Sequence, residues 1–168
     1  MSIKLIALDL DGTTLNEKGR ITDRTRTTLE AAAEGGVNIV VATGRPFTAL
    51  PADIFDVSAI RYVITSNGAS ITDLKEDKVI YRNCMSPLTA EKAVELLRNL
   101  PYIIEAFTYG EAYMQADYYN QVKRTRQSFR GVDYLLNTRE PMEDIFGYIL
   151  DHKEVIENIN VNLEDISV

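Results

Sequence analysis

Residues 3–15 read IKLIALDLDGTTL, an apolar run that ends in two acids, a glycine and two threonines. The run from residue 5 to residue 8 is short, continuous and followed by turn residues, which is typical of a strand buried on both faces of a parallel sheet. Asp9 and Asp11 are two positions apart, so their side chains project to the same side of extended backbone. Two carboxylates held together at a strand end repel each other and lose solvation, and a divalent cation is the simplest remedy.

The turn after the two acids has a structural and a chemical interpretation. The structural one is an Asp-Gly turn whose carboxylates cap backbone groups. In the chemical one, Gly12 permits a tight turn, and Thr13 and Thr14 offer hydroxyl and N–H groups that cradle an anion. The whole string DLDGTTL favours the second, because it resembles the first motif of the haloacid dehalogenase-like superfamily, whose members are mostly magnesium-dependent phosphatases. The resemblance implies that Asp9 attacks phosphorus and that Asp11 handles the proton.

A second candidate segment follows one helix later. Residues 22–36 (TDRTRTTLEAAAEGG) predict a helix capped by Thr22, and residues 37–42 (VNIVVA) predict a strand that runs into Thr43-Gly44-Arg45-Pro46. Strand, helix and strand compose one βαβ unit, and ligands of such sheets bind beyond the carboxyl ends of the strands. As structure, TGRP is a strand-to-helix turn. Beside DLDGTTL it resembles the second motif of the same superfamily, in which Thr43 and neighbouring N–H groups would hold a phosphoryl oxygen.

A third segment, residues 61–70 (RYVITSNGAS), predicts a strand that ends in Asn67-Gly68, a pair that tolerates positive φ and favours a turn. It resembles the NGA that follows the third strand in Cof-type (subclass IIB-like) phosphatases, which carry a large α/β cap. The resemblance assigns phosphate or substrate binding to residues of all three turns, and a metal ion to the two acids. The phosphate or substrate set is Gly12, Thr13, Thr43, Gly44, Arg45, Asn67 and Gly68, and the Mg²⁺ set is Asp9 and Asp11.

The rest of the chain alternates predicted helices and strands. Residues 47–60 predict a helix interrupted by Pro51, and residues 71–82 predict a β-hairpin, after which the pattern changes near residue 83. The second half predicts, in order, a helix at 89–100, strands at 102–108 and 111–115, helices at 116–131 and 140–152, and a strand at 157–163. The first of these helices groups on one face Ala93, Val94, Leu96, Leu97 and Leu100.

A basic stripe accompanies the predicted helix at 116–131. The stripe starts at Lys123 and continues three and seven positions later with Arg126 and Arg130, a spacing that places all three on one helix face. A solvated surface is the commoner interpretation of such a stripe, and contact with a substrate is the alternative.

Composition limits the classes of function. The chain has 168 residues, 45% of them hydrophobic and 26% charged, enough for one compact domain or two small ones. The net charge of -7 argues against a nucleic-acid surface, because Lys and Arg supply most affinity for the phosphate backbone. A single cysteine, Cys84, and a single histidine, His152, leave little for a disulfide, a histidine-based metal site or a Ser-His-Asp triad. With no signal peptide and no apolar run of bilayer length, we expect a cytoplasmic protein without a membrane partner.

These motifs together predict an α/β fold. We expect residues 1–83 to form the N-terminal part of a Rossmann-like, doubly wound parallel-sheet core, and residues 84–168 to form an inserted α/β cap domain. The later lysine of the family and its G-D-x-x-N-D motif do not occur in this sequence. We therefore expect an incomplete core whose first strand is an exposed sheet edge that is prone to self-association.

The leading functional hypothesis is a magnesium-dependent phosphatase that acts through an aspartyl-phosphate on a small phosphorylated metabolite such as a sugar phosphate. One alternative is a catalytically incomplete fragment, or a non-catalytic phosphate- or metal-binding module of the same fold. Another is a phosphoacceptor like that of response regulators, which the TGRP and NGA segments disfavour.

Overall fold

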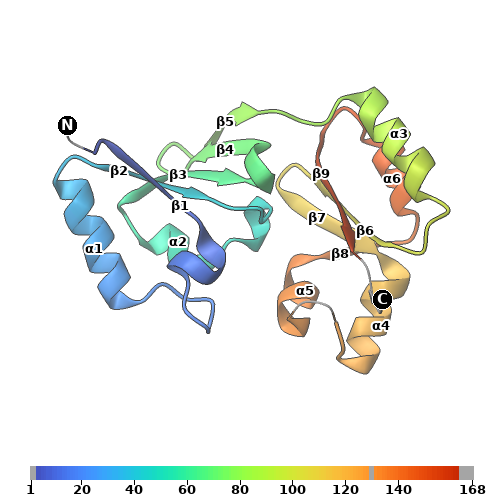
Figure 1. Ribbon diagram of the computed structural model, residues 1–168, viewed down its shortest axis with the longest axis horizontal. Coiled ribbons are helices and arrows are strands. Elements are labelled where there is room, and N and C mark those ends of the chain that lie inside the picture. The colour runs from blue at the N-terminus through green and yellow to red at the C-terminus, as the bar shows by residue number, and fades with distance from the viewer. Residues whose placement is uncertain (1–2, 129–130, 163–168) are drawn as a thin grey trace. The chain divides into compact units, whose positions relative to one another are not determined.

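A computed structural model of the protein describes residues 3–128 and 131–162. The chain divides into two compact units, residues 1–83 and residues 84–168 (Figure 1). The division falls where the sequence pattern changes, and each unit has its own sheet and its own buried clusters. Over the part of the chain that the structure describes, no helix has the length and apolarity that crossing a bilayer requires. The cytoplasmic location and the absence of nucleic-acid and membrane partners stay predictions.

The first unit is built on a five-stranded sheet in the order β1-β2-β3-β4-β5. Its elements, in chain order, are β1 (Leu5–Leu8), α1 (Asp23–Glu34), β2 (Asn38–Ala42), α2 (Ala52–Asp56), β3 (Ile60–Thr65), β4 (Ser70–Asp73) and β5 (Lys78–Arg82). The strands β1, β2 and β3 are parallel, and β4 and β5 extend the sheet as an antiparallel hairpin. The predicted βαβ unit and hairpin are confirmed, and Pro51 separates α2 from a short 3-10 turn at Phe47–Ala49, as its position in the sequence predicts.

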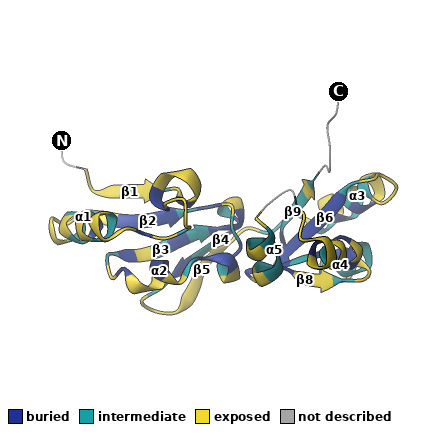
Figure 2. Ribbon diagram, turned by 90° about the horizontal axis from the view of Figure 1, so that it is seen from below, coloured by how far each residue is buried: buried dark blue, intermediate teal, exposed yellow. Residues whose placement is uncertain are grey.

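β1 is not buried on both faces, and the prediction was wrong on this point. Leu5 is 56% exposed, whereas most of β2 beside it is buried (Figure 2). Among the described residues β1 pairs only with β2, in the register Leu5↔Asn38 to Leu8↔Val41, which makes it an edge strand. An apolar run is buried on both faces only where neighbouring strands and helices cover it. The predicted exposed edge is therefore present, while self-association through it stays a prediction.

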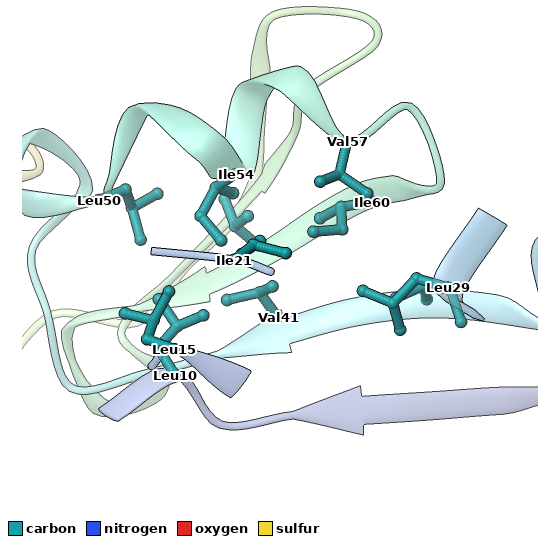
Figure 3. Close-up of a cluster of buried hydrophobic side chains, with 11 residues drawn as sticks. Leu10, Leu15, Ile21, Leu29, Val41, Leu50, Ile54, Val57 and Ile60 are labelled. Carbon is teal, nitrogen blue, oxygen red and sulfur yellow. The ribbon is translucent and has the colours of Figure 1, made fainter. Parts of the chain in front are cut away.

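The core of the first unit lies on one face of its sheet. Ile39 and Val41 are two positions apart on β2 and meet Leu29 of α1 and Ile54 of α2, so both helices cover the same face (Figure 3). Leu10, which is fully buried, belongs to the same cluster. Burial of a leucine side chain stabilises a fold by roughly 1.5–3 kcal/mol. The Leu10 side chain therefore anchors the turn after β1 to this core.

A buried carboxylate joins the loop after this turn to α2. Asp53 is only 3% exposed. It accepts hydrogen bonds from Arg20 Nε (2.8 Å) and from the backbone N–H of Ile21 (2.9 Å), and Arg20 Nη2 lies 2.7 Å from its other oxygen. The hydrogen bond from Arg20 is the largest cause of a lowered pKa of Asp53, burial opposes it, and the Ile21 N–H adds to it. The folded protein therefore stabilises the charged form of this carboxyl group.

The second unit has a four-stranded sheet in the order β8-β7-β6-β9, with helices on both faces. Its elements, in chain order, are α3 (Pro87–Leu97), β6 (Ile103–Thr108), β7 (Glu111–Gln115), α4 (Ala116–Thr125), α5 (Val132–Thr138), β8 (Glu140–Met142), α6 (Ile145–Asp151) and β9 (Ile156–Asn162). Every residue of the inner strand β6 is buried. Ile104 packs with α3 and α6, and its neighbour Ile103 packs with α4 and α5, as the alternation of side chains along a strand requires.

The predicted apolar face of α3 was partly wrong. Its buried residues are Ala90 and Val94, with Leu97 packed against the same cluster, a spacing of four and three positions. Leu96 is 72% exposed and Leu100 is 43% exposed. Leu96 lies two positions after Val94, about 200° around a helix of 3.6 residues per turn, and therefore points away from the core.

The predicted helix at 116–131 was too long. α4 ends at Thr125 because Arg126 adopts a left-handed conformation with φ of 56°. Lys123 and Arg126 consequently do not share a helix face, and Arg126 forms an ion pair with Asp133 of α5, a helix that the sequence pattern did not predict. Arg130, the third member of the predicted stripe, lies outside the described residues.

The predicted helix at 140–152 began too early. Residues Glu140–Met142 form β8, which pairs in parallel with β7, and the helix α6 starts at Ile145 behind its cap Asp144. The cap explains the difference, because the Asp144 side chain accepts from the backbone N–H of Gly147 and so starts the helix there, while Pro141 is tolerated on the edge strand β8.

A buried ion pair lies in the second unit. The side chains of Glu105 and Arg139 are 0% and 1% exposed, with Arg139 Nη2 3.2 Å from Glu105 Oε2. Asn160 Nδ2 donates to the same oxygen (3.1 Å), and the guanidinium lies over the ring of Phe107. Glu105 Oε1 and Arg139 Nε have no hydrogen-bond partner within the described ranges. The two charges of this pair are therefore balanced by each other rather than by solvent.

Asp53→Asn should destabilise the first unit by about 1–3 kcal/mol at pH 7, because a charged hydrogen-bond acceptor is lost from a buried site. The pKa of Asp53 is lowered in the folded state, so its stabilising effect is fully present above the unfolded value of about 3.9 and is lost progressively as the pH falls from there through the lowered folded-state pKa. Urea unfolding should show a larger difference between variant and wild type at pH 7 than at pH 3. Asp56→Asn, an exposed carboxyl on the same helix, is the control, and an equal effect of both variants would contradict this role.

Candidate active site

The three motifs of the sequence lie at neighbouring strand ends. Asp9 directly follows β1, Thr43 directly follows β2, and Ser66 directly follows β3. Since β1, β2 and β3 are parallel and adjacent, their carboxyl ends meet at one edge of the sheet. This is the edge at which ligands of parallel α/β sheets bind.

The turn after β1 holds both acids in water. Leu10–Thr14 form a wide turn in which Gly12 has a φ of 72°, and the backbone N–H of Leu15 donates to the Leu10 carbonyl (3.0 Å). Asp9, Asp11, Gly12 and Thr13 are all exposed, because Leu10 between the acids is drawn into the core. The premise that the two carboxylates lose their solvation was therefore wrong. The turn leaves both carboxylates exposed to solvent.

Hydrogen bonds join the second turn to the third. The backbone N–H of Asn67 donates to the Thr43 carbonyl (3.3 Å), and that of Ser66 donates to the Arg45 carbonyl (2.9 Å). The turns also touch at Gly44, where an added Cβ would lie 2.7 Å from the Asn67 side-chain oxygen. The Thr43 hydroxyl is buried and accepts from the Arg45 N–H (3.2 Å). Thr43, Gly44 and Asn67 are thus brought together.

The third strand ends earlier than predicted. β3 stops at Thr65, and the three residues after it have φ values of 51° (Ser66), 56° (Asn67) and 97° (Gly68). The sequence predicts positive φ for Asn67 and Gly68, and this is confirmed. It gives no signal for Ser66, since serine has no preference for the left-handed region. Three successive left-handed residues turn the chain sharply away from β3 and keep this turn at the strand end.

Arg45 binds Asp11, which lies 34 positions earlier in the chain. Its Nε donates to Asp11 Oδ2 (2.9 Å) and its Nη2 to Asp11 Oδ1 (2.7 Å), while Nη1 donates to the Ala49 carbonyl (2.9 Å). The Arg45 side chain is 14% exposed and that of Asp11 is 61% exposed. The first and second motifs are therefore joined by an ion pair in fork geometry. The sequence indicated neither this pair nor the part of Ala49, because both contacts depend on how the turns fold.

The oxygen atoms of this edge suit magnesium in kind. Asp9 offers a carboxylate, and Asp11, whose carboxylate oxygens both accept from Arg45, has a backbone carbonyl to offer. Hard cations such as Mg²⁺ prefer oxygen ligands of this type. Within residues 3–128 and 131–162 no cluster of three or more His, Cys, Asp or Glu is placed to hold a metal ion. The carboxylate of Asp9 and the carbonyl of Asp11 are thus oxygens of the kind that a magnesium site uses.

Comparisons with known proteins agree with this arrangement. Residues 6–167 match the sequence profile of the haloacid dehalogenase-like hydrolases. The phosphatase YwpJ of Bacillus subtilis is 34% identical over 112 residues, which are 66% of this chain and 39% of that protein. The matched part therefore covers less than half the length of this relative.

Solved structures show the same fold. A haloacid dehalogenase-like hydrolase from B. subtilis superposes on 98% of this chain and 63% of its own length, with a TM-score of 0.73 and 24% identity. A subclass IIB sugar phosphatase superposes on 86% of this chain and 55% of its own length, with a TM-score of 0.66 and 22% identity. The predicted α/β class with a Rossmann-like parallel sheet is confirmed by this likeness and by the strand order.

The chain belongs to the haloacid dehalogenase-like hydrolase family. This confirms the resemblance carried by DLDGTTL, TGRP and NGA, which lie within the matched residues.

Gly44→Ala should displace the Asn67 side chain, because the new Cβ would lie 2.7 Å from its oxygen. We expect a stability loss of about 1 kcal/mol and a clear shift of the Asn67 side-chain amide signals in ¹⁵N NMR spectra. Gly131→Ala, where the nearest atom is 3.8 Å from the new Cβ, should leave those signals in place. Unshifted Asn67 signals in Gly44→Ala would contradict the contact between the two turns.

Proposed function

We propose that this protein is a magnesium-dependent phosphomonoester hydrolase. The observation that supports this most is the meeting of Asp9, Asp11 and Thr43 at adjacent ends of parallel strands, with Arg45 and Asn67 bonded to the same turns. Two exposed acids and a set of turn N–H groups form a site at which a phosphoryl group can be attacked and its oxygens held. The family membership and the name of the relative YwpJ support the same activity.

The proposed reaction has two displacements at phosphorus. An oxygen of the Asp9 carboxylate forms a bond to phosphorus as the ester P–O bond breaks, and the leaving oxygen takes a proton from Asp11. In the second displacement Asp11 takes a proton from water, whose oxygen replaces Asp9 on phosphorus and releases inorganic phosphate. The Thr43 hydroxyl and the N–H groups of Gly12, Thr13 and Gly44 are proposed to hold the phosphoryl oxygens, with Asn67 and Gly68 beside them.

Magnesium would be held by the Asp9 carboxylate and the Asp11 carbonyl. When bound, it neutralises negative charge on the phosphoryl group, which a chain of net charge -7 otherwise repels. The aspartyl-phosphate and the metal requirement are features of the proposal that the family suggests.

We further propose that residues 1–83 are part of the catalytic core and that residues 84–168 are a cap that selects the substrate. The substrate class is a small phosphorylated metabolite, with sugar phosphates the first compounds to test, because a solved structure of the same fold is a sugar phosphatase.

A non-catalytic phosphate- or metal-binding module is the second candidate. It is favoured by one observation, namely that no third acid joins Asp9 and Asp11 in the part of the chain that is described. Such a module would bind phosphate without releasing it from esters.

Asp9→Asn should lower phosphate release by the intact protein more than about 10³-fold, because an amide is nearly isosteric with a carboxylate but is a poor nucleophile. Release from a panel of sugar phosphates and from p-nitrophenyl phosphate measures this. Asp77→Asn, an exposed aspartate of the β4–β5 hairpin, serves as the control. Substantial turnover by Asp9→Asn would remove Asp9 from the nucleophile role, and phosphate binding without turnover in the wild type would favour the second candidate.

Removal of divalent metal should silence the enzyme reversibly. We expect EDTA to abolish phosphate release and added Mg²⁺ to restore it, because the proposed site uses oxygen ligands and has no histidine. Calorimetric titration should also show weaker Mg²⁺ binding by Asp9→Asn than by wild type. Full activity in the presence of chelator would refute the magnesium assignment.

A further inference from the structure

Arg45 has a place in the site that differs from the phosphate-binding role suggested by its motif. Two parallel hydrogen bonds, Nε to Oδ2 (2.9 Å) and Nη2 to Oδ1 (2.7 Å), connect its guanidinium to both oxygens of Asp11. Such a fork fixes the rotation of a carboxylate as well as its position, which a single point charge does not do.

Arg45 is the fixed member of this pair. Its Nη1 is bonded to the Ala49 carbonyl (2.9 Å), its backbone N–H to the Thr43 hydroxyl (3.2 Å), and its own carbonyl accepts from Ser66 (2.9 Å). Its side chain is 14% exposed, whereas that of Asp11 is 61% exposed and belongs to a turn at the surface. Because both the backbone and the guanidinium of Arg45 are held by other residues, Arg45 fixes the position of the more exposed Asp11, and not the reverse.

These contacts leave Arg45 poorly placed to bind phosphate. At least three of its guanidinium N–H groups already donate to protein oxygens at 2.7–2.9 Å. A phosphoryl oxygen would have to displace the Asp11 carboxylate or the Ala49 carbonyl, and either change leaves a protein acceptor without its charge-assisted bond.

We propose that Arg45 is the positioning residue of Asp11 and acts on the reaction through that carboxylate and not through the phosphate. The inference rests on the proposed function, since it assigns Arg45 to the proton transfer that Asp11 carries out there. When Asp11 is protonated, one oxygen stays bonded to Arg45 and the other, whose bond to Arg45 has opened, carries the proton. That proton passes to the leaving oxygen, while the remaining bond from Arg45 keeps the carboxyl group in place. Arg45 therefore assists the first displacement, which kcat/KM reports, for substrates whose leaving group needs a proton, and it has little effect on the KM of those substrates.

The test compares Arg45→Lys and Arg45→Met in the intact protein. The quantity compared is kcat/KM, which reports the first displacement and not the later attack by water. For a sugar phosphate, a poor leaving group, we expect kcat/KM to fall about 10- to 100-fold, a part of what a general acid contributes, with KM within about threefold of wild type. For p-nitrophenyl phosphate, a good leaving group, kcat/KM should fall less than about threefold. In the Asp11→Asn background, Arg45→Met should cause no further loss.

Arg20→Lys is the matched control, because Arg20 forms the same two-bond fork with Asp53 in the same unit but lies outside the proposed chemistry. Arg20→Lys should lower stability, and any change in kcat/KM should be the same for the sugar phosphate and for p-nitrophenyl phosphate. An independent readout is the ¹⁵N signal of the Arg45 Nε–H, which should be protected from exchange in wild type and lost or shifted in Asp11→Asn.

The outcomes separate this inference from the proposed function. If turnover depends on Asp9 but Arg45→Met raises KM in both the wild-type and the Asp11→Asn backgrounds, Arg45 is a phosphate ligand and the inference fails alone. The same holds if Arg45 variants lower kcat/KM equally for both leaving groups, or if the Nε–H signal is unchanged in Asp11→Asn. Turnover that does not depend on Asp9 would overturn the proposed function and this inference with it.

Discussion

The parallel pairing of β1, β2 and β3 is the constraint on which the candidate site depends. Because the three strands run in one direction, the three turns that follow them lie side by side, although they are far apart in the sequence. Each turn is also held at the carboxyl end of its strand by contacts of its own. Leu10 anchors the first turn in the core. The carbonyls of Thr43 and Arg45 accept from Asn67 and Ser66 and so join the second turn to the third, and the Arg45 side chain binds Asp11 of the first turn. The candidate site is thus built on loops whose positions are set by a rigid sheet.

The two acids of the candidate site are exposed to solvent, so folding does not require a cation between them. Carboxylates buried together would demand a counter-ion for folding, but Asp9 and Asp11 are in water and Asp11 has an arginine. The structure alone therefore does not need a metal ion to be stable. A metal, when bound, would serve the phosphoryl group rather than the fold, so that metal removal should affect activity far more than it affects stability.

The sequence predicted what depends on neighbouring residues and failed where distant residues decide. Thr22 caps α1 and Pro51 interrupts the segment before β3, as local rules require. The burial of β1 depends on which strands flank it, and no local pattern contains that information. The end of α4 depends on a left-handed Arg126, a conformation that arginine rarely adopts. The same distinction holds for the candidate site, where Asp9 and Asp11 are predicted from one motif, while the bond from Arg45 to Asp11 spans 34 positions.

The buried pair of Glu105 and Arg139 constrains how the second unit can change over evolutionary time. Replacing either residue alone would leave an uncompensated charge in the interior, at a penalty of about 3–5 kcal/mol, a large part of the stability of a typical domain. Replacing both by apolar residues of similar volume would be close to neutral. We therefore expect the two positions to change together, because a single substitution on the way to the apolar pair gives a much less stable protein.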